Sequence, residues 1–239
     1  MKLSFSTRGW GSLSWEELLS SAQDMKFSGI EVYNLFKFPA LTDRGGPFHK
    51  HNIAATVRQL RDLKLSIPCL DTSMDLSDCI ADADIVAEMM ATAHDLQVPY
   101  VVAWASHGDA EGEAMLHENM ERLLPIAEEL GVCLLIKTSG IFADTARLRS
   151  LLESYASDFT GALWDMHHPY RDFGESADAT IKNLGTYVKH VHLRDSDDKD
   201  TYNLIGEGNI PVSDMMRALS SINYDGFISL EFIQIHMYK

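Results

Sequence analysis

Hydrophobic residues recur along the chain in two alternating patterns. Short, nearly continuous apolar runs predict buried strands, and longer segments with apolar residues at helical spacing follow them. The predicted strands cover residues 3–6, 29–33, 66–74, 98–106, 132–137, 161–166, 188–195 and 226–232. The predicted helices cover residues 14–25, 51–63, 80–96, 113–130, 145–156, 180–187 and 212–222. Continuous apolar strands that alternate with helices indicate a parallel sheet with helices packed on its outside.

Eight strands of this kind close most economically as a barrel. We therefore predict a single α/β domain over residues 1–239, a (β/α)8 TIM barrel, with an open doubly wound sheet as the alternative. Neither a linker nor a shift in composition divides the chain. Only a few residues follow the last strand, so we expect the barrel to lack its last helix, either because the sequence is truncated or because another chain packs there. We accordingly expect a homo-oligomer.

Composition and charge narrow the classes of partner. Hydrophobic residues make up 46% and charged residues 23% of the 239 residues, which is typical of a globular protein and excludes a disordered chain, collagen or a coiled coil. The net charge of -15 would repel nucleic acid and anionic membranes. The sequence has no signal-peptide core and no apolar run long enough to span a membrane, and its three cysteines lack CxxC spacing. We expect a cytoplasmic protein with a small-molecule partner and with neither a nucleic-acid nor a membrane partner.

Ionisable residues stand at the carboxyl ends of five predicted strands, where TIM barrels have their active sites. They are Glu31, Lys137, Asp165, His192 and Glu231. About one barrel unit separates each of the last four from the next, so we expect their side chains to return to the same rim. An aspartate, a histidine and a glutamate together suit Mn, Mg, Zn or Fe better than a soft metal. The alternative for each residue alone is an ordinary solvated loop residue.

Five short segments along the chain read, in order, GIEVY, WDMHHP, KHVHLRD, LIGEGNIP and ISLEF. Over residues 2–232 the chain thereby resembles the xylose-isomerase-like TIM barrel superfamily, especially its sugar phosphate isomerase/epimerase branch. The resemblance implies a divalent metal held by a glutamate on the fifth strand together with Asp165, His192 and Glu231. It also implies that the metal polarises a substrate carbonyl and hydroxyl while two glutamates move protons at the adjacent carbons. The implied function is isomerisation or epimerisation of a small sugar or sugar phosphate, with Glu231 as base and ligand.

One position of that ligand set departs from the family pattern. Where the family has a glutamate, the chain reads LIKTSG, with Lys137 in its place. Two unit charges about 4 Å apart interact by roughly 4 kcal/mol at an effective dielectric of 20, so a divalent ion beside an ammonium meets about twice that repulsion. We therefore expect binding of a divalent metal (Mn, Mg or Zn) to be weakened or lost, unless Lys137 turns away or loses its proton.

Three interpretations of Lys137 stay open. In the first, a metal binds through Asp165, His192 and Glu231, and Lys137 is neutral or displaced. In the second, Lys137 is a substitute cation, ion-paired with Asp165 and Glu231, that polarises a carbonyl or forms a Schiff base. In the third, the site is retired, and the chain is a catalytically degenerate carbohydrate-binding or subunit-forming relative. An endonuclease-type member of the superfamily is opposed by the acidity of the chain and by its incomplete ligand set.

Further residues near the predicted rim are candidates for substrate binding. In the family pattern His168 lies beside substrate or metal, and Glu31 has the chemistry to accept hydrogen bonds from a substrate hydroxyl or to orient a ligand. Trp10 and His107 follow strands one and four, where they could line a sugar-sized pocket. Arg194 is a nearby cation for a substrate phosphate. For each of these residues, ordinary packing or a salt bridge at the rim is the alternative.

The strand that carries His192 holds a second histidine. His190 lies two residues earlier and therefore on the same face of the strand, deeper in the barrel. We expect it to be a hydrogen-bonded core residue rather than a ligand.

Overall fold

Eight parallel strands form the centre of the molecule in the computed structural model, which describes residues 1–10, 13–35, 40–199 and 201–231. The strands are β1 (Lys2–Ser6), β2 (Gly29–Glu31), β3 (Leu70–Asp75), β4 (Tyr100–Trp104), β5 (Cys133–Lys137), β6 (Thr160–Asp165), β7 (Val188–Leu193) and β10 (Phe227–Leu230). Their order is β2-β1-β10-β7-β6-β5-β4-β3. Parallel bridges from Gly29 to Ser66 and from Val32 to Leu70 join the two edges. The predicted α/β barrel is confirmed, and these bridges exclude the open sheet.

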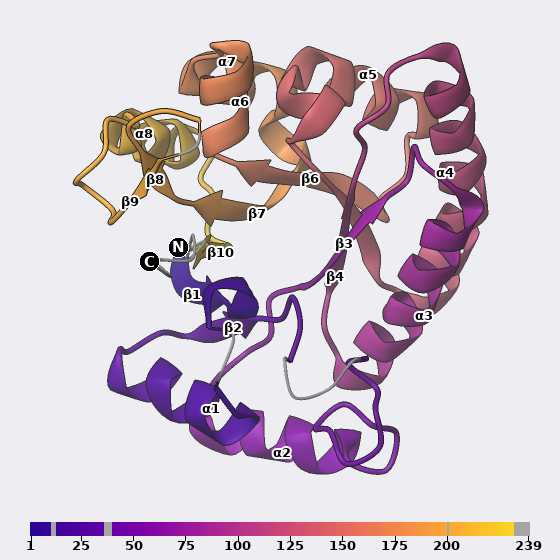
Figure 1. Cartoon of the computed structure of the whole chain (residues 1–239), viewed down its shortest axis with the longest axis vertical. Coiled ribbons are helices and arrows are strands. Elements are labelled where there is room, and N and C mark those ends of the chain that lie inside the picture. Colours follow the sequence, from indigo (N-terminus) through magenta and orange to yellow (C-terminus); the bar gives the residue numbers. More distant parts are fainter. Residues whose placement is uncertain (11–12, 36–39, 200, 232–239) are drawn as a thin grey trace, which may run out of the picture.

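Seven predicted helices are present, and they lie around the outside of the strands (Figure 1). They are α1 (Trp15–Asp24), α2 (Ile53–Leu63), α3 (Ile80–Leu96), α4 (Ala110–Leu130), α5 (Thr145–Tyr155), α7 (Ala177–Leu184) and α8 (Val212–Ser221). Helix α1 begins with a capping box, in which Ser14 Oγ accepts from the Glu17 backbone N–H at 3.3 Å and Glu17 accepts from the Ser14 backbone N–H at 2.6 Å. Pro125 lies within α4 without ending it.

The structure differs from the sequence prediction mainly where the chain leaves the strands. A short helix, α6 (His167–Phe173), follows β6, and an antiparallel pair, β8 (Asp195–Ser196) and β9 (Tyr202–Asn203), follows β7. Helix α7 begins earlier than predicted because the Ser176 side chain caps it by accepting from the Ala179 backbone N–H. Three 3-10 turns cover Thr7–Gly9 (η1), Gly140–Ala143 (η2) and Gly185–Tyr187 (η3). The expectation that a last helix is missing falls on residues 232–239, outside the described residues.

The inner face of the barrel changes from apolar to ionisable along the strands. Leu135 and Leu163 belong to a small buried cluster with Val102, Cys69 and Cys133. Because side chains alternate between the two faces of a strand, the residues two positions further on share the inner face at the carboxyl end. For β5 and β6 those residues are Lys137 and Asp165. None of the described helices is long and apolar enough to cross a membrane.

Candidate active site

Four strand ends deliver charged side chains to one buried point at the carboxyl end of the barrel. Lys137, Asp165 and His192 end or nearly end β5, β6 and β7, and Glu231 follows β10, where its backbone N–H donates to Leu193 O at 3.1 Å. Lys137 Nζ lies 3.4 Å from Asp165 Oδ2 and 3.5 Å from Glu231 Oε2. His192 Nδ1 lies 3.4 Å from the same Glu231 oxygen. The structure therefore brings together the four residues that the sequence had placed on one rim.

Two arginines complete this cluster. Arg194, which follows β7, contacts Asp165 Oδ2 and lies 3.1 Å from Glu231 Oε2 through the same nitrogen, NH2. Arg8, in η1, donates through NH1 to Glu231 Oε1 at 2.9 Å. Arg194 was expected as a cation for a substrate phosphate; its side chain is buried and pairs with carboxylates of the chain, and its role toward a phosphate stays a prediction. We call Lys137, Arg194, Arg8, Asp165 and Glu231 the charged floor.

Mutual attraction fixes the charge states within the charged floor. Burial alone would raise the pKa of Glu231, but the charges of Arg194 and Lys137 outweigh it and hold that pKa well below its usual range. The pKa of Asp165 is lowered in the same way, against burial, chiefly by Arg194. For Lys137, burial would lower the pKa, yet Glu231 and Asp165 raise it above its usual value. Lys137 is therefore an ammonium at neutral pH, between two carboxylates.

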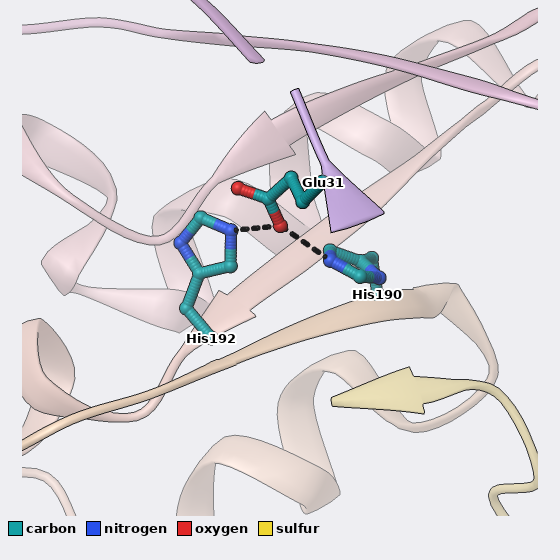
Figure 2. Close-up of side chains that lie close together, drawn as sticks. All are labelled: Glu31, His190 and His192. Carbon is teal, nitrogen blue, oxygen red and sulfur yellow. Dashed lines mark hydrogen bonds and ion pairs between the residues drawn. The ribbon is translucent and has the colours of Figure 1, made fainter. Parts of the chain in front are cut away.

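Beneath the charged floor, Glu31 joins the two histidines of β7 (Figure 2). Its Oε2 atom lies 2.8 Å from Nε2 of His190 and 2.8 Å from Nε2 of His192, and all three side chains are fully buried. Burial would lower the pKa of His192, but the Glu31 carboxylate outweighs it and raises this pKa to about 9. Burial lowers the pKa of His190. His192 is thus an imidazolium at neutral pH, while His190 is the hydrogen-bonded core residue that we expected.

Two groups of residues have the spacing of metal ligands. One is Asp165, His192 and Glu231, and the other is Glu31, His190 and His192; in each group the ligand atoms lie within 4.8 Å of one another. Both groups share His192, and both are fully buried. The sequence-derived ligand set is therefore assembled in space, with the ammonium of Lys137 beside it.

A cavity of about 490 Å³ opens above the charged floor. Arg8, Lys137 and Arg194 line it, together with His168, Trp104 and Tyr202. His168 accepts at Nε2 from Arg194 NH2 at 3.0 Å, and its Nδ1 lies 2.7 Å from Asp172 Oδ2. That hydrogen bond is the main cause that lowers the pKa of Asp172, so Asp172 stays ionised and holds the imidazole in one orientation.

Two candidate residues do not line the 490 Å³ cavity. Trp10 packs against Phe5, with ring centroids 4.8 Å apart, and lines a neighbouring cavity of about 200 Å³ that shares Arg194 and Tyr202 with the larger one. His107 is half-exposed, and its Nε2 lies 3.8 Å from Asp78 Oδ1. Neither is among the described residues that line the 490 Å³ cavity. Both follow their strands in loops, where the alternation of a strand no longer dictates the direction of a side chain.

Arg8 and Asp71 were missed by the sequence analysis, although both line the 490 Å³ cavity. Arg8 follows β1 directly, and its position two residues after a strand end was the available signal. Asp71 lay inside the strand predicted over residues 66–74. The structure also places Asp71 within β3, so no strand end singled it out, although it lines the cavity.

Comparisons with known proteins agree with this architecture. The family model described as xylose isomerase-like TIM barrel matches residues 19–236. Fructoselysine 3-epimerase from Escherichia coli O157:H7 is 24% identical over 165 residues, which cover 64% of this chain and 60% of that protein. The uncharacterized protein MJ1311 from Methanocaldococcus jannaschii is 26% identical over 196 residues, which cover 77% and 62%. The chain therefore spans less than two thirds of the length of these relatives.

Solved structures share the fold at low sequence identity. A structure of L-ribulose 3-epimerase superposes with a TM-score of 0.80 and 19% identity, covering 98% of this chain and 82% of that one. The probable 3-DHS dehydratase AsbF from Bacillus anthracis gives a TM-score of 0.78 with 16% identity, covering 99% and 94%. The shared barrel thus accompanies more than one named activity. On the match over residues 19–236, the chain belongs to the xylose isomerase-like TIM barrel family.

Proposed function

We propose that the chain is an isomerase or epimerase of a small sugar, and that the cations of the charged floor act where relatives of this fold would hold a divalent metal. The observation that carries the proposal is the position of Lys137 Nζ, 3.4 Å from Asp165 Oδ2 and 3.5 Å from Glu231 Oε2. The names of its relatives support a sugar substrate, since two of them are fructoselysine 3-epimerases.

The residues present do not fit a divalent ion. The two oxygens that would bind it, Asp165 Oδ2 and Glu231 Oε2, both already face Lys137 and Arg194. The third ligand would be His192, whose pKa is raised to about 9, and an imidazolium has no lone pair to offer. An added dication would meet three positive groups at contact distance. We therefore derive no step through a metal.

Lys137 and Arg194 are suited to stabilise the negative charge that develops on a reacting carbonyl oxygen. When a proton leaves the carbon beside a carbonyl, negative charge develops on the carbonyl oxygen, and fixed donors aimed at that oxygen lower the barrier. Lys137 and Arg194 line the cavity and remain charged at neutral pH. A substrate carbonyl in the cavity would accept hydrogen bonds from Lys137 and Arg194, which would stabilise the enediolate oxyanion.

His168 is the group best prepared to take the proton. Asp165 and Glu231 are weak bases, because their neighbours hold both pKa values low. His168 instead donates from Nδ1 to Asp172 and accepts at Nε2 from Arg194 NH2 at 3.0 Å. When Arg194 turns this N–H toward the substrate carbonyl, the Nε2 lone pair becomes free to take a proton in the cavity. In this proposal the base is therefore His168, whereas the family resemblance had implied Glu231.

The proton balance then distinguishes two outcomes. Nε2 of His168 takes the proton from the carbon beside the carbonyl, and the electron pair of that bond moves onto the carbonyl oxygen as the enediolate forms. If His168 returns the proton to the former carbonyl carbon, and a proton moves from the hydroxyl of the carbon that was deprotonated to the enediolate oxygen, the product is an isomer. If the Lys137 ammonium instead donates a proton to the opposite face of the carbon that was deprotonated, the enediolate oxygen becomes a carbonyl again and the product is an epimer. After release of the epimer, His168 gives its proton to solvent and Lys137 takes one up. The expected cytoplasmic location and homo-oligomer do not enter this mechanism and stay predictions.

The test is proton exchange in D2O by protein treated with a chelator. D-fructose, D-tagatose and D-psicose serve as probes, because these sugars appear with solved structures of this fold. We expect deuterium at the carbon beside the carbonyl and a new sugar by NMR, with at least a hundredfold loss in Lys137→Met and none in Lys182→Met, which is a control on α7. Exchange that needs added Mn²⁺ would contradict the proposal. Tight sugar binding without exchange would favour the degenerate carbohydrate-binding relative instead.

A further inference from the structure

A second cavity adjoins the candidate active site. It has a volume of about 380 Å³ and lies between the segment after β2 and helix α3. Asp71 of β3 lines both this cavity and the 490 Å³ cavity. We call the smaller one the side cavity. Its size is that of a ligand subsite rather than of a packing defect.

Two residues that line the side cavity each have a buried acceptor atom without a donor. Asp71 is 3% exposed, and its Oδ1 atom accepts from the Ser73 backbone N–H at 2.9 Å. Its other oxygen, Oδ2, is buried and has no hydrogen-bond partner, and the same is true of Asn34 Oδ1. A buried acceptor without a donor costs free energy, so such atoms in native proteins normally meet a ligand or a water.

The described residues that line the side cavity include two charged ones, Asp71 and Glu88, and both are acids. Asp71 is buried, whereas Glu88 is exposed. Arg8 and Lys137 lie near enough for their charges to interact with Asp71, but among the described residues no ion pair within 4.0 Å joins either of them to it. A carboxylate that is buried and unpaired calls for a cationic donor.

Apolar and hydroxyl-bearing side chains also line the side cavity. Leu35, Ile85 and Met89 are apolar, and the hydroxyl-bearing residues include Thr42, Thr72 and Thr92. This combination suits a short aliphatic arm that ends in an ammonium, because the methylene groups bury against apolar surface and the head reaches the carboxylates. A neutral sugar hydroxyl would satisfy an acceptor but would leave Asp71 without an ion-pair partner.

We propose that the side cavity binds an alkylammonium arm carried by the substrate, so that the substrate class is an amine-bearing sugar. That the substrate is a sugar rests on the proposed function. That it carries an ammonium group rests on Asp71, Asn34 and Glu88 alone. The sugar ring or chain occupies the 490 Å³ cavity above Lys137, and the arm passes Asp71 into the side cavity.

Calorimetric binding with two matched probes tests this inference. One probe is a ketohexose with a four-carbon amine arm at C1, and the other has an arm of equal length that ends in a methyl group. We expect wild-type protein to bind the ammonium arm at least tenfold more tightly. Asp71→Asn should abolish most of that ratio and Glu88→Gln should reduce it, while Glu128→Gln, an exposed control on α4, should preserve it.

Equal affinities for the two arms, or a ratio that survives Asp71→Asn, would overturn the inference and leave only ordered water in the side cavity. Because the ratio is a binding measurement, it separates the two proposals. An intact ratio without sugar turnover would overturn the proposed function alone. Turnover of neutral ketohexoses without any preference for the ammonium arm would overturn this inference alone.

Discussion

The charged floor and the side cavity each have a buried carboxylate, but only the carboxylates of the charged floor have cationic partners within 4.0 Å among the described residues. In the charged floor, Asp165 and Glu231 are surrounded by Lys137, Arg194 and Arg8. In the side cavity, Asp71 keeps an oxygen without any partner. Asp71 lines both the side cavity and the 490 Å³ cavity above the charged floor.

This difference separates charges that the fold neutralises from charges that it leaves to a ligand. A fully paired buried cluster loses stability when one member is removed, because the others become uncompensated. An unpaired buried carboxylate loses little when its charge is removed, because the charge was already unfavourable. The following substitutions measure that contrast, from the largest expected effect to the smallest.

Removal of Arg194 should have the largest effect. Arg194→Met leaves Asp165 and Glu231 with Lys137 as their only close buried partner in the charged floor, and breaking a buried pair costs about 3–5 kcal/mol. Urea denaturation should show this loss in the free energy of unfolding. Arg217→Met, which removes an exposed pair with Asp214, is the control and should change stability by less than about 0.5 kcal/mol. Equal small losses for both variants would refute the claim that the charged floor is tightly paired.

The imidazolium of His192 should make stability depend on pH. Its pKa is raised to about 9 in the folded state from an ordinary value near 6.5, so its contribution is fully present below pH 6.5 and is lost as the pH rises through 9. The free energy of unfolding should fall by on the order of 3 kcal/mol over that interval. His192→Gln should remove this dependence. If the variant and the wild type show the same slope, His192 is neutral.

Removal of Arg8 should have an intermediate effect. Its side chain is 30% exposed, and its pair with Glu231 Oε1 is 2.9 Å long, so water already screens part of the interaction. Arg8→Met should therefore cost about 1 kcal/mol, clearly less than Arg194→Met. Thermal denaturation of the two variants side by side gives the order. A larger loss of stability for Arg8→Met than for Arg194→Met would contradict this order and would make the partly exposed pair the more stabilising one.

Removal of the Asp71 charge should have the smallest effect on stability. Asp71→Asn keeps an acceptor for the Ser73 N–H and removes a buried charge that lacks an ion pair. The free energy of unfolding should stay constant or rise by up to about 1 kcal/mol. Asp165→Asn is the matched comparison and should lose several kcal/mol. A loss of that size in Asp71→Asn would show that the carboxylate is compensated in the fold.

The sequence predicted the fold well because periodicity encodes it. Apolar runs and helical spacing identified all eight barrel strands and seven of the helices, although not the β8–β9 pair. The positions of Lys137, Asp165 and His192 at strand ends, about one barrel unit apart, placed them on one rim, where the structure brings them together. These inferences depend on regular spacing along the chain. The departure at Lys137 came instead from the resemblance to the family pattern.

What the sequence did not predict depends on contacts between distant loops. Arg8 and Glu231 are 223 residues apart, and no periodic pattern relates them. Arg194 follows the end of β7, so its turn toward Asp165 depends on tertiary packing rather than on alternation along a strand. The side cavity escaped notice because Asp71 was assigned to the interior of a strand. Its lack of a partner is visible only once all neighbours are placed.

The central claim is that Lys137 and Arg194 take the place of a divalent ion, and a Mn²⁺ titration of wild type and Lys137→Glu tests it most directly. Electron paramagnetic resonance of free Mn²⁺ reports the bound fraction without any need for activity. We predict no saturable binding by the wild type up to about 1 mM, and one bound Mn²⁺ in Lys137→Glu that Asp165→Ala abolishes. Stoichiometric binding by the wild type that Asp165→Ala removes would contradict the claim.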